Sequence, residues 1–145
     1  MTPSPFGRHQ RCGFRLARAL ITAIEANDCK AEVLLDIDWI ISEDTVVRPD
    51  VVVLCGGVPE RHVTEPPALV AEVLSPGTSD RDRNEKLWLY EESGVMYYLI
   101  VDPDSSTLIA YQRDATGKFG KWNAESLQFA ICDDCEIVLD RKAAF

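Results

Sequence analysis

Two acidic residues stand inside short apolar segments of this chain, and they limit the ways in which it can fold. Asp50 lies within residues 46–54 and Glu72 within residues 68–74, and both segments are rich in Val, Leu and Ala. Such segments, bounded by Gly or Pro, are typical of strands that are buried on both faces. An ionised carboxylate is rarely buried alone, because desolvating an unpaired charge is costly. The sequence therefore predicts two neighbouring buried strands whose acids share a positively charged partner.

The 145-residue chain is expected to form one domain over residues 1–145. Its content of 46% hydrophobic and 27% charged residues is typical of a globular protein rather than a disordered one. No apolar run approaches the roughly 20 residues that a membrane span needs, and the N-terminus lacks an apolar signal core. We therefore predict a cytoplasmic protein without a membrane partner.

The five cysteines are odd in number and irregular in spacing, so they are expected to be reduced thiols. Cys132 and Cys135 have the spacing of half a zinc site or of a redox motif. A structural zinc needs four ligands, and no second CxxC or paired His is present. Two thiols in a late turn are the favoured interpretation.

Residues 7–26 have the pattern of an amphipathic helix. Its expected apolar face consists of Phe14, Ala17, Leu20, Ile21 and Ile24. A basic stripe runs beside that face and consists of Arg8, Arg11, Arg15 and Arg18. The whole chain carries a net charge of −9, which argues against broad attraction to nucleic acid, so the stripe has two interpretations. It is either a solvated flank whose long stems cover apolar surface or an edge that contacts phosphates.

The remaining segments alternate between strand and helix signals. Residues 32–41 are predicted to form a strand that pairs as a hairpin with the Asp50 strand. Ser79 is expected to cap a helix that ends near Ser93, because Gly94 follows as a stop signal. Later strands are predicted at residues 95–101, 107–112 and 136–139. This order favours an α/β domain with a mixed sheet.

An acid in one strand, an acid in the next and Lys86 on the following helix form a pattern suited to metal-dependent phosphodiester hydrolysis. Two carboxylates, Asp50 and Glu72, can hold Mg²⁺ (or Mn²⁺), while a lysine stabilises charge on a phosphate oxygen. The competing interpretation is a structural salt bridge in which Lys86 neutralises the acids. One lysine does not balance two carboxylates, however, which favours a divalent cation.

A series of motifs in this order resembles the Uma-type putative restriction endonuclease family, a branch of the PD-(D/E)XK nuclease superfamily. The motifs are Arg48-Pro49-Asp50, Glu72-Val73-Leu74-Ser75-Pro76, Asp82, Lys86-Leu87, Tyr90, Gly94-Val95 and Tyr98 through Val101-Asp102-Pro103, with Arg8-His9-Gln10 before the first helix. The resemblance covers most of the chain. It implies a restriction-endonuclease-like mixed central sheet flanked by helices.

The resemblance also implies roles for single residues. Asp50 matches the first metal-binding acid of the family and Glu72 the second. The usual motif has a lysine where this chain has Leu74, which would offer only its backbone carbonyl, and Lys86 on the next helix takes the lysine's place.

Two further residues, Asp82 and Tyr90, correspond to groups that would orient Lys86. The chain departs from the family where Met96-Tyr97 replaces Pro-Glu. The resemblance also implies a start later than in most members, so the chain is expected to be N-terminally short for its family.

The expected function is therefore a Mg²⁺-dependent endonuclease that acts on DNA. A homodimer is expected, because pairing two sites would allow both strands to be cut. The alternative is a catalytically inactive nuclease-fold module that acts in DNA binding or oligomerisation through the basic stripe.

Overall fold

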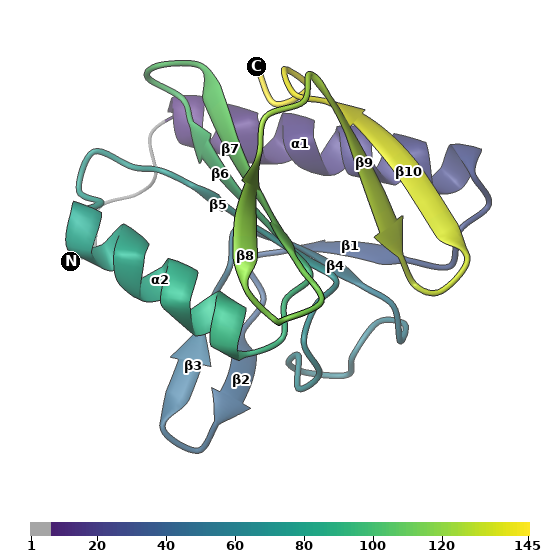
Figure 1. Cartoon of the computed structure of the whole chain (residues 1–145), viewed down its shortest axis with the longest axis horizontal. Helices are drawn as coiled ribbons and strands as arrows, with labels where there is room; N and C mark the ends of the chain where they lie inside the picture. The colour runs from purple at the N-terminus through teal and green to yellow at the C-terminus, as the bar shows by residue number, and fades with distance from the viewer. Residues whose placement is uncertain (1–6) are drawn as a thin grey trace.

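The computed structural model describes residues 7–145 and contains a six-stranded central sheet with one helix on each face (Figure 1). The strands in spatial order are β1 (Glu32–Leu35), β4 (Val51–Leu54), β5 (Leu69–Val73), β6 (Tyr97–Asp102), β7 (Thr107–Arg113) and β8 (Phe119–Trp122). The β5–β6 pair is parallel and the other pairs of this sheet are antiparallel. The predicted α/β fold with a mixed central sheet flanked by helices is confirmed.

The parallel pair is joined by helix α2 (Asp80–Glu92), which begins and ends where local signals predict. The Ser79 hydroxyl accepts a hydrogen bond of 3.1 Å from the Asp82 backbone N–H and so caps the first turn. Gly94 follows the helix with φ of 90°, a conformation that glycine adopts without steric cost.

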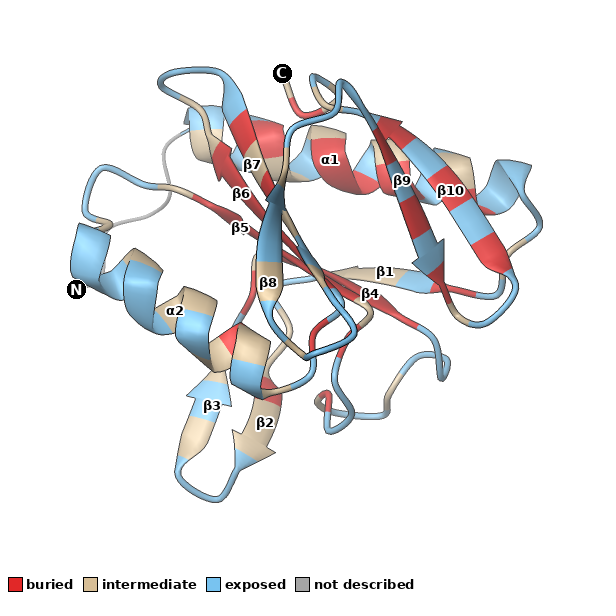
Figure 2. Cartoon of the chain, in the orientation of Figure 1, coloured by how far each residue is buried: buried red, intermediate tan, exposed pale blue. Residues whose placement is uncertain are grey.

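The sheet separates two apolar clusters. Helix α1 (Gly7–Ala26) and the hairpin of β9 (Ser126–Ile131) and β10 (Cys135–Asp140) cover one face. Helix α2 covers the other, where Tyr90 packs against Tyr98. Strands β4 and β5 are buried along their whole length, as predicted, and Figure 2 shows this buried band running through the centre of the molecule. Glu72, within β5, is therefore placed at the core, and Asp50 lies partly buried at its edge, one residue before β4.

The apolar face of α1 differs from the predicted one. Phe14 is 60% exposed and Ile21 is 40% exposed, whereas the buried positions are Cys12, Leu16, Ala17, Leu20 and Ile24. The buried stripe is centred on Leu16 and Leu20, so Phe14 and Ile21 extend beyond it towards the edge of the sheet. Together with Leu35 of β1 they line an apolar groove of about 270 Å³.

The prediction of a single strand over residues 32–41 is wrong. The chain bends at Asp36, whose φ is 49°, and β2 (Trp39–Ser42) then pairs with β3 (Thr45–Val47) in a separate hairpin. Only β1 pairs with β4, next to Asp50. Asp36 and Asp38 mark this break, because this segment leaves the sheet instead of alternating within it.

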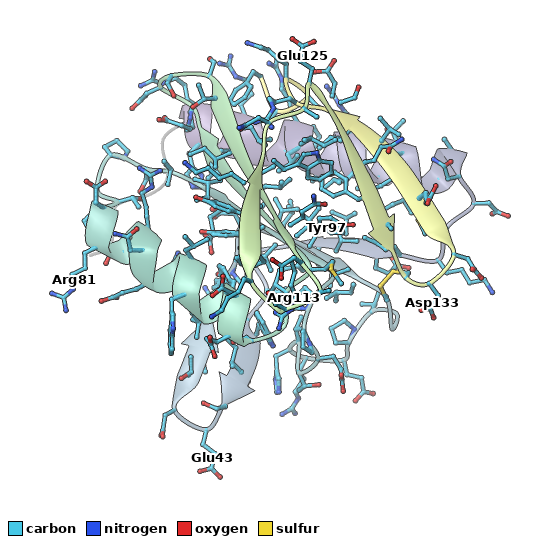
Figure 3. The ribbon with its side chains drawn as sticks, in the orientation of Figure 1. Glu43, Arg81, Tyr97, Arg113, Glu125 and Asp133 are labelled. Atoms are coloured by element: carbon cyan, nitrogen blue, oxygen red, sulfur yellow. A yellow bond between two sulfur atoms is a disulfide. The ribbon has the colours of Figure 1, made fainter. Side chains whose placement is uncertain are left out.

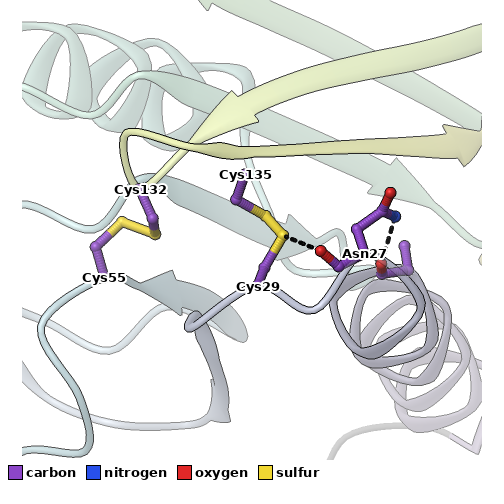
Figure 4. The surroundings of a disulfide bond; sticks show 6 residues. Asn27, Cys29, Cys55, Cys132 and Cys135 are labelled. Carbon is purple, nitrogen blue, oxygen red and sulfur yellow. Dashed lines mark hydrogen bonds between the residues drawn. A yellow bond between two sulfur atoms is a disulfide. The ribbon is translucent and has the colours of Figure 1, made fainter.

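The prediction of reduced thiols is wrong for four of the five cysteines. Cys29 is bonded to Cys135 and Cys55 to Cys132, as Figure 4 shows. Cys12 is a buried free thiol. The partners are separated by 106 and 77 residues, so the spacing of Cys132 and Cys135 reflects neither a zinc half-site nor a redox pair. Both bonds attach the turn between β9 and β10 to the rest of the domain.

Within residues 7–145, no helix has the length and apolar character needed to cross a membrane.

Candidate active site

The two predicted acids lie on neighbouring antiparallel strands. Asp50 immediately precedes β4, Glu72 lies in β5, and Val51 pairs with Ala71 in the register between them. Asp50 Oδ2 accepts a hydrogen bond of 2.7 Å from the backbone N–H of Val73. This bond ties the carboxylate of one strand to the chain next to the acid of the other.

Glu72 is the most enclosed charged group of the site. Its side chain is in contact with α2, where the Tyr90 hydroxyl donates a hydrogen bond of 2.6 Å to Oε1. The Lys86 Nζ lies 3.3 Å from Oε2. Burial raises the pKa of Glu72 to about 7, although Lys86 and Tyr90 each lower it. Glu72 is therefore placed to change its protonation state near neutral pH.

Burial also raises the pKa of Asp50, and three groups act against that shift: the Val73 N–H, His9 and Lys86. His9 comes from the first turns of α1, and its Nε2 lies 3.7 Å from Asp50 Oδ2. No chemical pattern in the sequence singled out His9, which was named only as part of the Arg8-His9-Gln10 motif. Its position at the start of a helix, three residues before the buried Cys12, was the available signal.

The predicted supporting residues differ in their placement. Tyr90 contacts Glu72 directly, so it acts on the acid rather than on Lys86. Asp82 is exposed, and in the part of the chain that the structure describes its carboxylate forms no ion pair or hydrogen bond with Lys86. A role for Asp82 in orienting Lys86 stays a prediction.

The basic stripe begins beside the site, because it shares the start of α1 with His9. Arg8 is engaged in an ion pair of 2.8 Å with Asp104. For Arg11, Arg15 and Arg18, no ion pair is found among residues 7–145. These three arginines remain available to an anionic partner, and their role in binding nucleic acid stays a prediction.

The donor set suits a hard divalent cation with few protein ligands. Residues 7–145 contain no group of three His, Cys, Asp or Glu side chains arranged to hold a metal. Mg²⁺ needs fewer, since it keeps several waters and binds through one or two carboxylates. Asp50 and Glu72 supply these, while Asp50 Oδ1 has no hydrogen-bond partner among the described residues. The residues present therefore fit Mg²⁺ or Mn²⁺.

The fold and the paired acids define a class of protein, the nuclease-fold domains. A crystal structure from Anabaena variabilis, described as "a putative nuclease belonging to DUF820", matches with a TM-score of 0.71 and 16% sequence identity. The match covers 100% of this chain and 84% of that one. At this identity the likeness shows the shared fold alone.

The sequence matches the model of the Uma2 family, "Putative restriction endonuclease", over residues 1–138. The chain therefore belongs to the Uma2 family, and the resemblance found in its motifs is confirmed. No curated protein shows significant sequence similarity to it.

Proposed function

We propose that this protein is a Mg²⁺- or Mn²⁺-dependent endonuclease that hydrolyses phosphodiester bonds in DNA. The observation that carries the proposal is the enclosure of Glu72, which is only 7% exposed yet lies within 3.3 Å of Lys86 Nζ and next to a second carboxylate. Membership of the Uma2 family supports the same reaction class.

In this proposal each residue has a distinct task. Ionised Asp50 and Glu72 hold the cation, which when bound polarises the phosphodiester and lowers the pKa of a water molecule. Lys86 Nζ stabilises negative charge on the phosphate. The pKa of Tyr90 is raised by burial and by Glu72, so its hydroxyl keeps its proton and holds the Glu72 carboxylate in place.

The competing function is a DNA-binding or oligomerisation module without turnover, in which the same residues form a structural ion pair. The charge count argues against that role. Among residues 7–145, Lys86 is the one Lys or Arg that forms an ion pair with either acid, and its side chain is 44% exposed. His9 offsets the charge of Asp50 only when it is protonated. Replacing a buried ion pair by apolar residues is often neutral or stabilising, so such a cluster is poor evidence of a purely structural role.

Metal binding and cleavage together test the proposal. Calorimetric titration with Mg²⁺ or Mn²⁺ should show binding that Asp50→Asn abolishes, and plasmid DNA should be nicked only by the metal-binding protein. Asp133→Asn is the matched control, because Asp133 lies on the exposed turn between β9 and β10, far along the molecule from α2 (Figure 3). Metal-independent cleavage, or equal metal binding in Asp50→Asn, contradicts the proposal. Salt-sensitive DNA binding without any cleavage supports the inactive module.

A homodimer is part of the proposal, and the apolar groove of Phe14, Ile21 and Leu35 is the face on which we place it. Phe14 and Ile21 lie two turns apart on α1, so a two-fold axis between them would bring Phe14 of one copy onto Ile21 of the other. The same axis would bring Arg11 near Glu25, which carries the opposite charge. The apolar part of the face is therefore complementary to a second copy of itself, whereas Arg18, which also lines the groove, would lie near its own counterpart.

A cytoplasmic location remains a proposal from the sequence. The two disulfides weigh against it, because such bonds persist mainly in oxidising compartments. Cell fractionation with a tagged chain decides between the cytoplasm and an oxidising compartment.

A further inference from the structure

A polar cleft of about 340 Å³ lies between α2 and the central sheet, separate from the side chains described above. Arg83 and Asn84 of α2 form one wall. Lys121 of β8 contributes to the opposite wall, and Ile100, Ile109 and Tyr111 line the sheet side. Nothing in the proposed reaction so far uses Arg83 or Lys121.

The sheet side of the cleft is continuous with the candidate active site. Glu72 pairs with Ile100 in the β5–β6 register, and Ile100 pairs with Ile109 in the β6–β7 register. Residues paired in this way lie side by side on one face, with adjacent strands about 4.8 Å apart. The Tyr90 hydrogen bond shows that Glu72 faces α2, the helix that forms the cleft wall. The cleft therefore begins about one strand spacing from Glu72.

The charged groups of the cleft favour an anion. Arg83 shares its charge with Asp80, but the closest approach is 3.7 Å and the Asp80 side chain is 97% exposed. For Lys121, no ion pair is found within residues 7–145. Two cations thus face one solvated carboxylate, and a guanidinium offers donors in a fork that matches phosphate oxygens.

The sheet side of the cleft suits the sugar or base of a nucleotide. Tyr111 is half-buried, and its ring stacks on that of Tyr98 with the ring centroids 6.1 Å apart, so the Tyr111 ring is held in place. Aromatic faces and apolar side chains are the surfaces on which sugars and bases pack in nucleic-acid sites. Two cations beside an aromatic and aliphatic surface therefore favour a nucleotide over a simple anion.

We infer that this cleft binds the nucleotide next to the scissile phosphate, with Arg83 and Lys121 contacting its phosphodiester and Tyr111 its sugar or base. The inference rests on the proposed function for the position of the scissile phosphate. Its own chemistry, the binding of a nucleic-acid strand, does not require turnover. Arg83 and Lys121 are positioning residues that set where the strand lies relative to Glu72.

The test is the salt dependence of binding to a short fluorescent DNA duplex, measured without divalent metal so that cleavage plays no part. Each lost phosphate contact should make the slope of log K against log salt concentration shallower by about 0.9. Arg83→Gln and Lys121→Gln should each show that loss, and the double variant about twice as much. Arg83→Lys keeps the charge and should retain the slope.

Arg81→Gln is the matched control. Arg81 lies on the same helix but extends away from the molecule (Figure 3) and pairs with Glu85 at 3.1 Å. Its loss should leave the slope unchanged. A slope unaltered in Arg83→Gln and Lys121→Gln, or lowered equally by Arg81→Gln, overturns the inference. Binding of inorganic phosphate that depends on Arg83 and Lys121, with duplex binding unaffected by either substitution, also overturns it, because the cleft would then be a site for free phosphate.

The two proposals fail separately. Unchanged slopes in a protein that still cleaves DNA with Mg²⁺ refute the cleft and leave the nuclease standing. Slopes that depend on Arg83 and Lys121 in a protein without cleavage refute the nuclease and leave the cleft as a nucleic-acid site.

Discussion

The Tyr90 hydroxyl donates a hydrogen bond of 2.6 Å to Glu72 Oε1, which connects α2 to the central strand β5 at a carboxylate almost closed off from solvent. Tyr90 also stacks on Trp39, with ring centroids 6.1 Å apart and planes 8° from parallel. The ring is thus held by packing, and the hydroxyl has a defined direction. The ionisation of Glu72 therefore depends on the position of α2 against the sheet as well as on burial.

Tyr90→Phe should raise the pKa of Glu72 above its value of about 7, because the burial remains and a stabilising donor is lost. A hydrogen bond to a charged group contributes about 1.5–3 kcal/mol, which corresponds to a shift of about one to two pH units. Metal binding needs the ionised acid, so the midpoint of Mn²⁺ affinity against pH should move upwards. Tyr111→Phe is the control, and an unmoved midpoint in Tyr90→Phe would show that the bond is not coupled to the site.

Glu72→Gln should change how stability depends on pH in metal-free protein. Burial raises the pKa of Glu72 in the folded chain from 4.5 to about 7. The protonated acid therefore stabilises the folded state below pH 4.5, and this contribution is lost as the pH rises to about 7. The loss amounts to about 3 kcal/mol in the wild-type chain and is absent in the variant. Urea unfolding at pH 5 and pH 8 should therefore show that the free energy of unfolding of Glu72→Gln, relative to that of the wild type, is higher at pH 8. A difference that is the same at both pH values contradicts the raised pKa.

Lys86→Met should lower the cleavage rate about 10²–10³-fold, as expected when a group that stabilises transition-state charge is removed. The substitution removes a cation 3.3 Å from Glu72 and so raises the pKa of that acid further. Metal affinity should therefore not fall when it is measured at a pH high enough to keep Glu72 ionised in the variant. Arg81→Met is the control, because Arg81 lies on the outer face of α2. Loss of metal binding together with cleavage would mean that Lys86 maintains the fold of the site.

The disulfides should contribute strongly to stability. Cys135→Ser should lower the free energy of unfolding by about 2–4 kcal/mol, because each bond closes a long loop of the unfolded chain. Alkylation of the unreduced, unfolded protein should label only Cys12, whereas reduction first should expose all five cysteines. A chain with all four bonded cysteines replaced by Ser should be insensitive to reductant. Five labelled thiols before reduction would contradict both bonds.

Phe14→Ser should convert the proposed homodimer into a monomer, because Phe14 is 60% exposed and contributes to the groove rather than to the core. Light scattering after size-exclusion chromatography measures the mass directly. Val138→Ser is the control, since Val138 is exposed to a similar degree, 54%, on β10. A wild-type monomer, or a dimer unaffected by Phe14→Ser, refutes this interface.

Local signals in the sequence predicted the elements that carry the site. Ser79 and Gly94 bound α2 because capping and a positive φ depend on neighbouring residues alone. The buried strands around Asp50 and Glu72 were predicted from their apolar composition, since a strand enclosed on both faces has few other options. The approach of Lys86 to Glu72 followed from the family pattern and agrees with the distance of 3.3 Å.

Features that join distant segments were missed or mistaken. The helix pattern of α1 was correct, but Phe14 and Ile21 were assigned to the core because a period of 3.6 residues does not say where a helix crosses its sheet. His9 reaches Asp50 only because α1 begins beside the end of β5.

The amino-acid sequence by itself determined the helices, the buried strands and the two acids set beside or within those strands, because periodicity, capping and apolar composition act over a few residues. Only the tertiary structure decided which cysteines are bonded, which hydroxyl holds Glu72, and that Arg83 and Lys121 face one cleft. Those relationships depend on strand register and on the packing of α2 against the sheet. They bring together residues that are far apart in the chain.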